Sequence, residues 1–460
     1  MLTIALIACA PIDAADAYDS ASDTGFDAAW DTAYEPSLAL PELTGAYGSG
    51  SPSTGALRFH GERPKNVLLI GIDTLRRDMI GAYAAAEDTP TLTRMLEGGV
   101  RLDDHRSCAN WTYPSLVCVS SGASVEEQGF GGSEETVFPG PTDGFLASRL
   151  ADAGATTRYL GATPFMDPAY RLTEGFDQAT NDADWNAERV VDHALDAIDE
   201  LEADEDPWFL QLHFLDAHLP YQAPDAYLPD IDFASLPIDL TTASGMSKLR
   251  AEWDTLSRPE QQDCLEAAMA LYRSEIQFLD DELGRLVEYL EETGTLDDTL
   301  VVLFSDHGEQ FWEHGEMGHK DTLYAQETRT LGGFFGGGLM PGVVDSPTTH
   351  ADLAPSIFAA LGLDAPEQTT GHVVGTAPDD RIRFTLRSNT VPVWQAAERD
   401  GGRVVVTWTG RIEYYRTDVD PDELHDLYEP GIDDTDALLD ALEIRASLLE
   451  GLVDGSPDFR

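Results

Sequence analysis

A continuous apolar run at residues 65–72 (KNVLLIGI) constrains the fold of this chain most. A strand made only of apolar side chains must be covered on both faces, which is typical of a parallel sheet between two layers of helices. Similar runs lie at 157–160, 208–214 and 300–304, and helical patterns at 187–201, 260–290 and 351–361 alternate with them. The alternation predicts an α/β fold with a mostly parallel central sheet and helices on both faces.

The pattern changes after about residue 379. Short β-rich segments separated by turns follow at 381–386, 403–408 and 411–415, and an amphipathic helical pattern occupies 435–452. This order predicts a small antiparallel sheet with a closing helix. The sequence therefore predicts a main α/β domain over 63–378 and a C-terminal α+β subdomain over 379–460 that packs on it.

The first residues predict export. Residues 1–9 form a short apolar run ending in Cys9, which resembles a bacterial lipobox without the usual positive charges. Residues 10–60 are rich in Asp, Ala, Ser, Thr, Gly and Pro, a composition typical of a disordered acidic tether. We therefore expect a membrane-anchored lipoprotein, periplasmic or on the cell surface; an N-terminus without a targeting role is the alternative. In an oxidising compartment, Cys108 and Cys118 would be able to pair.

The charge balance excludes some partners. The chain has 28 Lys and Arg against 84 Asp and Glu, a formal net charge of −56, and its lysines are Lys65, Lys248 and Lys320. Nucleic acid and anionic membrane surfaces would repel such a protein, so non-specific binding to either is not expected. The acidity is typical of a protein kept soluble in a salty medium. None of the four cysteines has the CxxC spacing of a structural zinc site.

Reactive side chains follow the predicted buried strands. Asp73 comes directly after the run at 65–72, and Asp306 and His307 directly after the run at 300–304. Thr112 precedes a stretch of small apolar residues that begins with a proline, so it would lie at a helix N-terminus, where anions are favoured. Since ligands bind at the carboxyl ends of parallel strands, these residues are candidates for a divalent metal and anion site. Taken singly, each is also compatible with a helix cap or an ordinary turn.

Seven segments in order resemble the sulfatase branch of the alkaline phosphatase superfamily. They lie at 65–83, 112–122, 213–221, 306–309, 320–324, 352–362 and 423–428. The resemblance extends from about residue 63 to residue 452. It implies an alkaline-phosphatase-like fold and an ester hydrolase.

Two positions depart from the formylglycine-dependent members of this family. The nucleophile position is Thr112 where they have Cys or Ser, and Leu116 replaces their arginine. A threonine cannot become formylglycine, because the conversion requires a primary alcohol or thiol carbon. The remaining set of Asp73, Thr112, Asp306 and His307 is similar to the single-metal site of lipoteichoic acid synthases and phosphoethanolamine transferases. It implies one divalent metal, with Mn or Zn favoured over Ca or Mg because an imidazole takes part.

The resemblance also implies roles at the site. Thr112 would be the nucleophile, with His218 and Lys320 as further catalytic residues. His218, His319, Lys320 and Asp216 would bind the substrate. A second metal at Asp216, His218 and His350 stays open.

We therefore expect a metal-dependent hydrolase or transferase of phosphate esters that forms a covalent phospho-enzyme. The substrate class includes lipid headgroups and glycans. One alternative is a sulfuric ester hydrolase that works without formylglycine. Another is a non-catalytic member that binds an anionic ligand, although such a member would be expected to lose its metal ligands.

Overall fold

The computed structural model describes residues 57–84, 88–124, 140, 142–204, 206–378, 380–387, 394–407, 409–432 and 435–442. All of them belong to one compact unit, Pro41–Arg460. The predicted signal at 1–9 and nearly all of the predicted tether at 10–60 lie outside the described residues. Within the described part of the chain, no helix combines the length and apolarity needed to cross a membrane.

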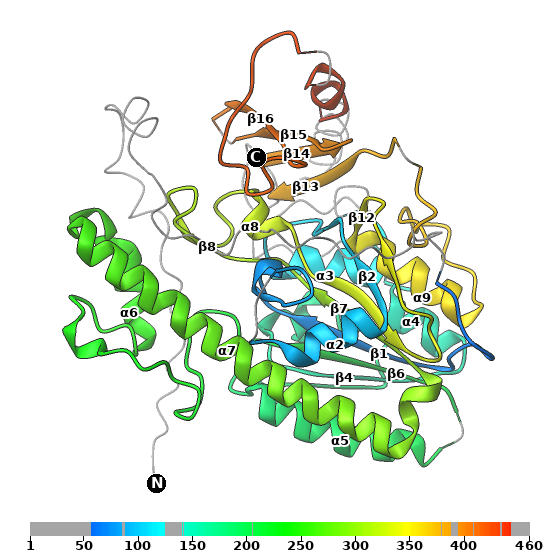
Figure 1. Ribbon diagram of the computed structural model, residues 1–460. Helices are drawn as coiled ribbons and strands as arrows, with labels where there is room; N and C mark the ends of the chain where they lie inside the picture. Colours follow the sequence, from blue (N-terminus) through cyan, green and yellow to red (C-terminus); the bar gives the residue numbers. More distant parts are fainter. Residues whose placement is uncertain are drawn as a thin grey trace. The chain divides into compact units, whose positions relative to one another are not determined.

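An eight-stranded sheet forms the centre of the unit (Figure 1). Its strands, in spatial order, are β11 (Gly342–Val344), β2 (Val100–Leu102), β10 (Gly332–Gly336), β7 (Thr299–Ser305), β1 (Asn66–Ile72), β6 (Trp208–Phe214), β4 (Thr156–Gly161) and β5 (Gln178–Asn181). β10 runs antiparallel to both of its neighbours, and every other pair is parallel. The prediction of a mostly parallel sheet is confirmed. The glycine-rich β10 (GGFFG) was not predicted, because it lacks the β-branched residues that indicate a strand.

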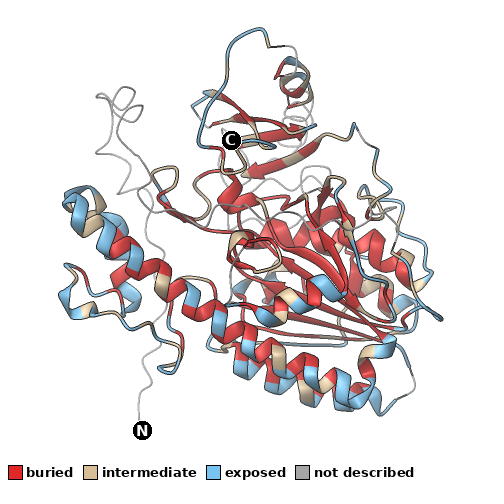
Figure 2. Ribbon diagram, viewed as in Figure 1, coloured by how far each residue is buried: buried red, intermediate tan, exposed pale blue. Residues whose placement is uncertain are grey.

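Helices cover both faces of this sheet (Figure 1). One face carries α2 (Pro90–Gly98), α5 (Ala187–Glu202) and α7 (Arg258–Thr293), and the other carries α3 (Thr112–Ser121), α4 (Leu146–Asp152) and α9 (Leu353–Leu361). Val67 and Leu69 of β1 pack into the cluster that includes α3, α4 and α9. All seven residues of β1 are buried, as a strand between two layers requires. Figure 2 shows the buried strands of the sheet, and α5 and α7 with one buried and one exposed side.

Shorter elements connect these layers. They are β3 (His105–Arg106), which pairs with β12 (Thr348–Thr349), the hairpin of β8 (Gln310–Phe311) and β9 (Met317–Gly318), and the helices α6 (Ala243–Glu252) and α8 (Ala325–Thr328). The β8–β9 hairpin and α8 follow β7 directly in the chain. They place several polar side chains beside the carboxyl end of that strand.

A four-stranded antiparallel sheet follows at the C-terminal end. It comprises β13 (Arg383–Arg387), β14 (Trp394–Arg399), β15 (Gly402–Val406) and β16 (Ile412–Arg416). Residues 435–442 are helical, and Leu438 and Leu442 pack against this sheet. The antiparallel sheet and the start of the closing helix agree with the sequence-based expectation, whereas residues 443–452 of that helix lie outside the described residues.

Buried ion pairs connect the C-terminal sheet to β3 of the main domain. From β3, Arg106 donates to Glu398 of β14 at 2.8 Å and to Glu423 at 3.0 Å. Arg403 donates to Glu398 at 3.2 Å, and Arg383 lies 3.1 Å from the other oxygen of Glu398. All five side chains are at most 4% exposed. Burial alone would raise the pKa of Glu398, but the three guanidinium groups hold it below its ordinary value.

We predict that Glu398→Gln lowers the free energy of unfolding by about 3–5 kcal/mol, since it leaves buried guanidinium groups without their carboxylate. Denaturant unfolding measures this, with Glu288→Gln on the exposed side of α7 as the control. The wild-type contribution is complete above the unfolded pKa of about 4.3 and is lost as pH falls toward the folded pKa. A variant as stable as the wild type at neutral pH would contradict the prediction.

Candidate active site

Three neighbouring strands bring acidic and imidazole groups together at their carboxyl ends. Asp73 follows β1, Asp306 follows β7, and His213 lies in β6 opposite Gly71 of β1. Ligand atoms of Asp73, His213 and Asp306 all lie within 4.8 Å of one another, and all three residues are buried. The parallel register of β6, β1 and β7 is what makes residues distant in sequence meet at one edge.

Thr112 is the first residue of α3, and it faces this group. Its Oγ lies 3.3 Å from Asp73 Oδ2 and 3.4 Å from His307 Nε2. His307 Nε2 in turn lies 3.6 Å from Asp73 Oδ1 and 3.5 Å from Asp306 Oδ2. The structure therefore brings together Asp73, Thr112, Asp306 and His307.

The ring of His307 is oriented by the backbone. Its Nδ1 lies 2.9 Å from the carbonyl oxygen of Gly308. Because a carbonyl only accepts, Nδ1 carries the proton, and Nε2 presents a lone pair to Thr112 and the carboxylates. Burial also lowers the pKa of His213 to about 4, so this second imidazole is neutral at pH 7. Neutral imidazoles are the form that binds metals.

The residues fit a divalent metal ion. Asp73 Oδ1, Asp306 Oδ2 and His213 Nε2 are buried and have no hydrogen-bond partner among the described residues. Burial raises the pKa of Asp306, and the adjacent Asp73 carboxylate raises it further. Two buried carboxylates at this separation are unfavourable without a cation between them. Two carboxylates with imidazole nitrogen form a ligand set typical of divalent transition metals.

His213 was not predicted as a ligand. It lies in the run WFLQLHF, which indicates a strand buried on both faces. This pattern gives no sign that the histidine binds a metal. The signal in the sequence was the imidazole itself, because a fully buried histidine in an apolar strand requires a polar partner.

A second pair of histidines lies beside this group. The rings of His218 and His319 are 5.1 Å apart, and His319 is 4.4 Å from the ring of His307. His218 Nδ1 faces the Leu219 carbonyl at 2.5 Å, and His319 Nδ1 faces Glu309 Oε1 at 3.3 Å. Both histidines are less buried than the carboxylates, although the His319 side chain is only 9% exposed.

Lys320 follows His319 and reaches toward the nucleophile segment. Its Nζ lies 5.5 Å from the centre of the Trp111 ring, and Trp111 directly precedes Thr112. The backbone of Lys320 has a φ of +80°, a conformation that a non-glycine residue adopts only when its surroundings impose it.

The buried carboxylate of Glu327 holds this turn. It accepts hydrogen bonds from Lys320 N at 3.1 Å, Asn110 Nδ2 at 2.9 Å and Gln310 Nε2 at 2.7 Å, and also from Thr322 Oγ1. Burial raises the pKa of Glu327 to about 8, while these hydrogen bonds act in the opposite direction. One side chain therefore joins the segments that carry Thr112, His307 and Lys320.

Two further predicted residues have their contacts elsewhere. Asp216 accepts a hydrogen bond from Ala187 N at 2.8 Å, at the start of α5, and burial raises its pKa to about 7. His350 Nε2 lies 3.0 Å from the Ser305 carbonyl. Among the residues that the structure describes, the one group of three or more possible metal ligands is that of Asp73, His213 and Asp306, which favours a single metal.

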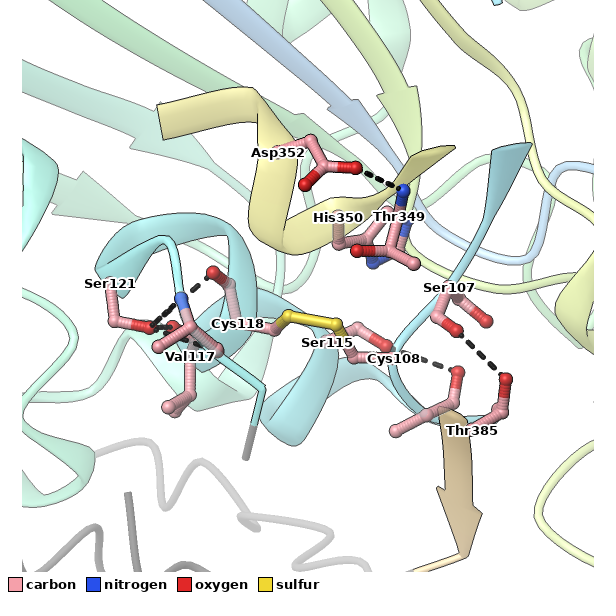
Figure 3. The surroundings of a disulfide bond; sticks show 12 residues. Ser107, Cys108, Ser115, Val117, Cys118, Ser121, Thr349, His350, Asp352 and Thr385 are labelled. Carbon is pink, nitrogen blue, oxygen red and sulfur yellow. Dashed lines mark hydrogen bonds between the residues drawn. A yellow bond between two sulfur atoms is a disulfide. The ribbon is translucent and has the colours of Figure 1, made fainter. Parts of the chain in front are cut away.

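A disulfide holds the nucleophile segment to its helix. Cys108 and Cys118 are bonded, which joins the residues leading to Thr112 with the body of α3 (Figure 3). Leu116 of α3, the residue at the arginine position of formylglycine-dependent members, is buried in the hydrophobic core. The Cys108–Cys118 bond agrees with the pairing that the sequence allows in an oxidising compartment.

Comparison with known proteins defines the family. The Sulfatase family model matches residues 65–363, and the chain therefore belongs to the sulfatase family of the alkaline phosphatase superfamily. It is 26% identical over 231 residues to the choline-sulfatase of Rhizobium meliloti, covering 48% of this chain and 44% of that protein. It is 23% identical to the uncharacterized sulfatase YidJ of Escherichia coli, covering 85% and 87%. The chain thus matches less than half the length of the choline-sulfatase.

Solved structures show the same fold. The phosphonate monoester hydrolase of Silicibacter pomeroyi has a TM-score of 0.66 at 21% identity, covering 83% of this chain and 94% of that one. A protein solved with its substrate D-glucosamine-2-N,6-O-disulfate has a TM-score of 0.69 at 16% identity, covering 85% and 99%. The alkaline-phosphatase-like fold is confirmed.

We predict that Glu327→Gln lowers kcat/KM by about 100-fold, because an amide nitrogen would face hydrogen-bond donors and displace the Lys320 turn. Steady-state kinetics measure this, with Glu266→Gln on the exposed side of α7 as the control. Metal content should stay at the wild-type level, which separates a positioning effect from loss of the metal site. Unchanged kinetics in a folded variant would contradict the role of Glu327.

Proposed function

We propose that this protein is a metal-dependent hydrolase or transferase of phosphate esters with Thr112 as its nucleophile. The observation that carries the proposal is the place of Thr112 Oγ, at the N-terminus of α3 and within 3.4 Å of both Asp73 and His307. A hydroxyl in this position lies next to a base and at the end of a helix dipole that favours anions.

Asp73, His213, Asp306 and His307 would hold the metal. When bound, a divalent ion would supply Lewis-acid stabilisation of the negative charge that develops on the ester. The imidazole nitrogens favour Mn or Zn over Ca or Mg, which prefer oxygen ligands.

The chain's own residues then account for bond formation and cleavage. Thr112 Oγ donates a hydrogen bond to Asp73 Oδ2. Asp73 is therefore the carboxylate that would accept the Thr112 proton before the attack. Attack forms an Oγ–P bond and breaks the bond between phosphorus and the leaving oxygen. His218, His319 and Lys320 would bind the anionic ester and stabilise the negative charge on the leaving oxygen. Water, or an acceptor alcohol, would then attack phosphorus, forming a new O–P bond and breaking the Oγ–P bond, and its proton would return to Thr112 Oγ.

The nucleophile favours phosphate over sulfate. Formylglycine hydrate releases sulfate by collapse of its second hydroxyl, and Thr112 has no such route. A phospho-threonine can instead be attacked in line at phosphorus. The burial of Leu116 supports the same conclusion, since a core leucine replaces the arginine of the maturation motif.

Hydrolysis of sulfate esters is the second candidate. The names of the relatives favour it, including the choline-sulfatase of Rhizobium meliloti and the arylsulfatase of Klebsiella aerogenes. It would require a route from a sulfo-threonine that does not use an aldehyde. A non-catalytic ligand-binding role is disfavoured by the convergence of Asp73, Asp306 and His307 on Thr112.

We predict that Thr112→Ala lowers kcat by at least about 1,000-fold, because the attacking oxygen is removed. Turnover of 4-nitrophenyl phosphate, bis(4-nitrophenyl) phosphate and 4-nitrophenyl sulfate is measured in metal-replete protein. Thr112→Ser, which keeps the hydroxyl, is the matched variant and should retain more phosphate ester turnover than Thr112→Ala. Chelation should abolish activity, and Mn or Zn should restore it.

Two results would overturn the proposal. Near-wild-type turnover by Thr112→Ala would remove the nucleophile assignment. Multiple turnovers of 4-nitrophenyl sulfate faster than of either phosphate ester would favour the second candidate.

We also propose that the protein is an exported lipoprotein attached to a membrane through Cys9. The Cys108–Cys118 disulfide supports export, because such bonds persist in oxidising compartments.

We predict that Cys9→Ser, expressed in a bacterium that processes lipoproteins, moves the protein from the membrane fraction to the soluble fraction. Fractionation and labelling with a fatty acid measure this. Native protein found reduced and in the cytoplasm would contradict it.

A further inference from the structure

We propose that Glu309 is a positioning residue that holds the imidazole of His319 toward the substrate. This inference rests on the proposed function, in which His319 helps to stabilise the negative charge on the leaving oxygen. It deepens that function by naming the group that fixes the ring, a carboxyl group with no part of its own in bond formation or cleavage.

The β8–β9 hairpin places Glu309 opposite His319. Its two strands are antiparallel, and Gln310 of β8 pairs with Gly318 of β9. Because the strands run in opposite directions, the neighbouring pair in this register is Glu309 and His319. The hairpin begins three residues after Asp306, at the carboxyl end of β7, so it carries both side chains beside the candidate metal site.

Two hydrogen bonds hold the carboxyl group of Glu309, which is fully buried. Its Oε1 lies 3.3 Å from His319 Nδ1, and its Oε2 accepts a hydrogen bond from the Tyr221 hydroxyl at 2.5 Å. Nε2 of His319 makes no hydrogen bond to any residue that the structure describes. With Nδ1 held by Glu309, Nε2 is the ring nitrogen that is left for the substrate.

The ring of His319 lies next to the nucleophile and its surroundings. Its centre is 4.4 Å from the ring centre of His307, and His307 Nε2 is 3.4 Å from Thr112 Oγ. The ring centre of His218 is 5.1 Å from that of His319. These contacts connect Glu309 with the candidate active site through His319.

Three imidazoles of the site are held through Nδ1, but by different acceptors. His307 Nδ1 faces the carbonyl oxygen of Gly308 at 2.9 Å. His218 Nδ1 faces the carbonyl oxygen of Leu219 at 2.5 Å. A carboxylate on Nδ1, as in His319, fixes the ring and also stabilises the charge that the ring gains when Nε2 carries a proton as well. Of the three, His319 is therefore best suited to donate to an anionic leaving oxygen.

Charged groups from other elements also surround Glu309. Arg76 Nη1 donates to the Glu309 carbonyl oxygen at 3.2 Å. Arg250 Nη1 and Glu309 Oε1 lie 3.6 and 3.8 Å from the point that a Cβ on Gly318 would occupy. Burial raises the pKa of Glu309 to about 7, while His218 and these two arginines act in the opposite direction. They add to the hydrogen bond with His319 and do not replace it.

The competing explanation is that Glu309 only anchors the hairpin to the loop that carries Tyr221. An anchor predicts lower stability and equal losses for every substrate. A positioning residue predicts larger losses for esters with poorer leaving groups, because these depend more on stabilisation of the leaving oxygen. It also predicts no further loss once His319 has been removed.

The first test compares phenyl and 4-nitrophenyl esters of the phosphate class that the metal-replete protein turns over. Glu309→Met, which has a similar length but no acceptor, should lower the ratio of kcat/KM for the phenyl over the 4-nitrophenyl ester by roughly tenfold. Glu309→Gln keeps an acceptor oxygen and should recover part of this loss. In the His319→Gln background, Glu309→Met should change the ratio no further. The control Glu316→Gln, exposed on the same hairpin, should leave the ratio unchanged.

The second test needs no turnover. NMR of isotope-labelled histidines in the zinc-loaded protein shows which ring nitrogen carries a proton, and the His319 signals are identified by their absence from His319→Gln. We expect a proton on Nδ1 of His319 in the wild type, and altered ring signals in Glu309→Gln. The wild-type measurement decides the inference even if Glu309→Met does not fold.

A proton on Nε2 of His319 alone, or equal losses on both esters in Glu309→Met, would overturn the inference while leaving the proposed nucleophile intact. A wild-type protein that turns over no phosphate ester would instead overturn the proposed function. The NMR measurement would then still decide whether Glu309 holds His319.

Discussion

The repulsion between two buried carboxylates organises this site. Asp73 and Asp306 extend from adjacent strands into a space that also receives His213 and His307, and all four side chains are buried. A bound cation would relieve this repulsion while both carboxylates stay charged, whereas without one the raised pKa of Asp306 favours a protonated carboxyl group. Thr112 belongs to the same site, because it is the first residue of α3 and its hydroxyl lies within 3.4 Å of Asp73 and His307.

Much of the fold and the centre of the site were predictable. The apolar run before Asp73 specifies a strand buried on both faces, and parallel strands end at a common edge. Residues that directly follow two such strands, Asp73 and Asp306, must therefore be neighbours if the strands are. His307 and Thr112 could be placed by the same reasoning, helped by the resemblance to the sulfatase family.

Other features depend on tertiary contacts that sequence patterns do not encode. The role of His213 could not be predicted, because apolar residues surround it in the sequence. The strand β10 could not be predicted, because it is rich in glycine. Glu327 acts through hydrogen bonds to residues up to 217 positions away in the chain, a separation at which no local pattern exists. The same holds for Arg387, which belongs to the C-terminal sheet and yet contacts the turn beside Lys320.

The most direct test of the account is to detect the covalent intermediate. Metal-replete protein would be mixed with a phosphate ester that it turns over, quenched in acid within the first turnover, digested and examined by mass spectrometry. The account predicts one phosphoryl group on the peptide that contains Thr112, located on Thr112 itself and absent from the Thr112→Ala protein. Turnover without any labelled Thr112, or with the phosphoryl group on another residue, would contradict it.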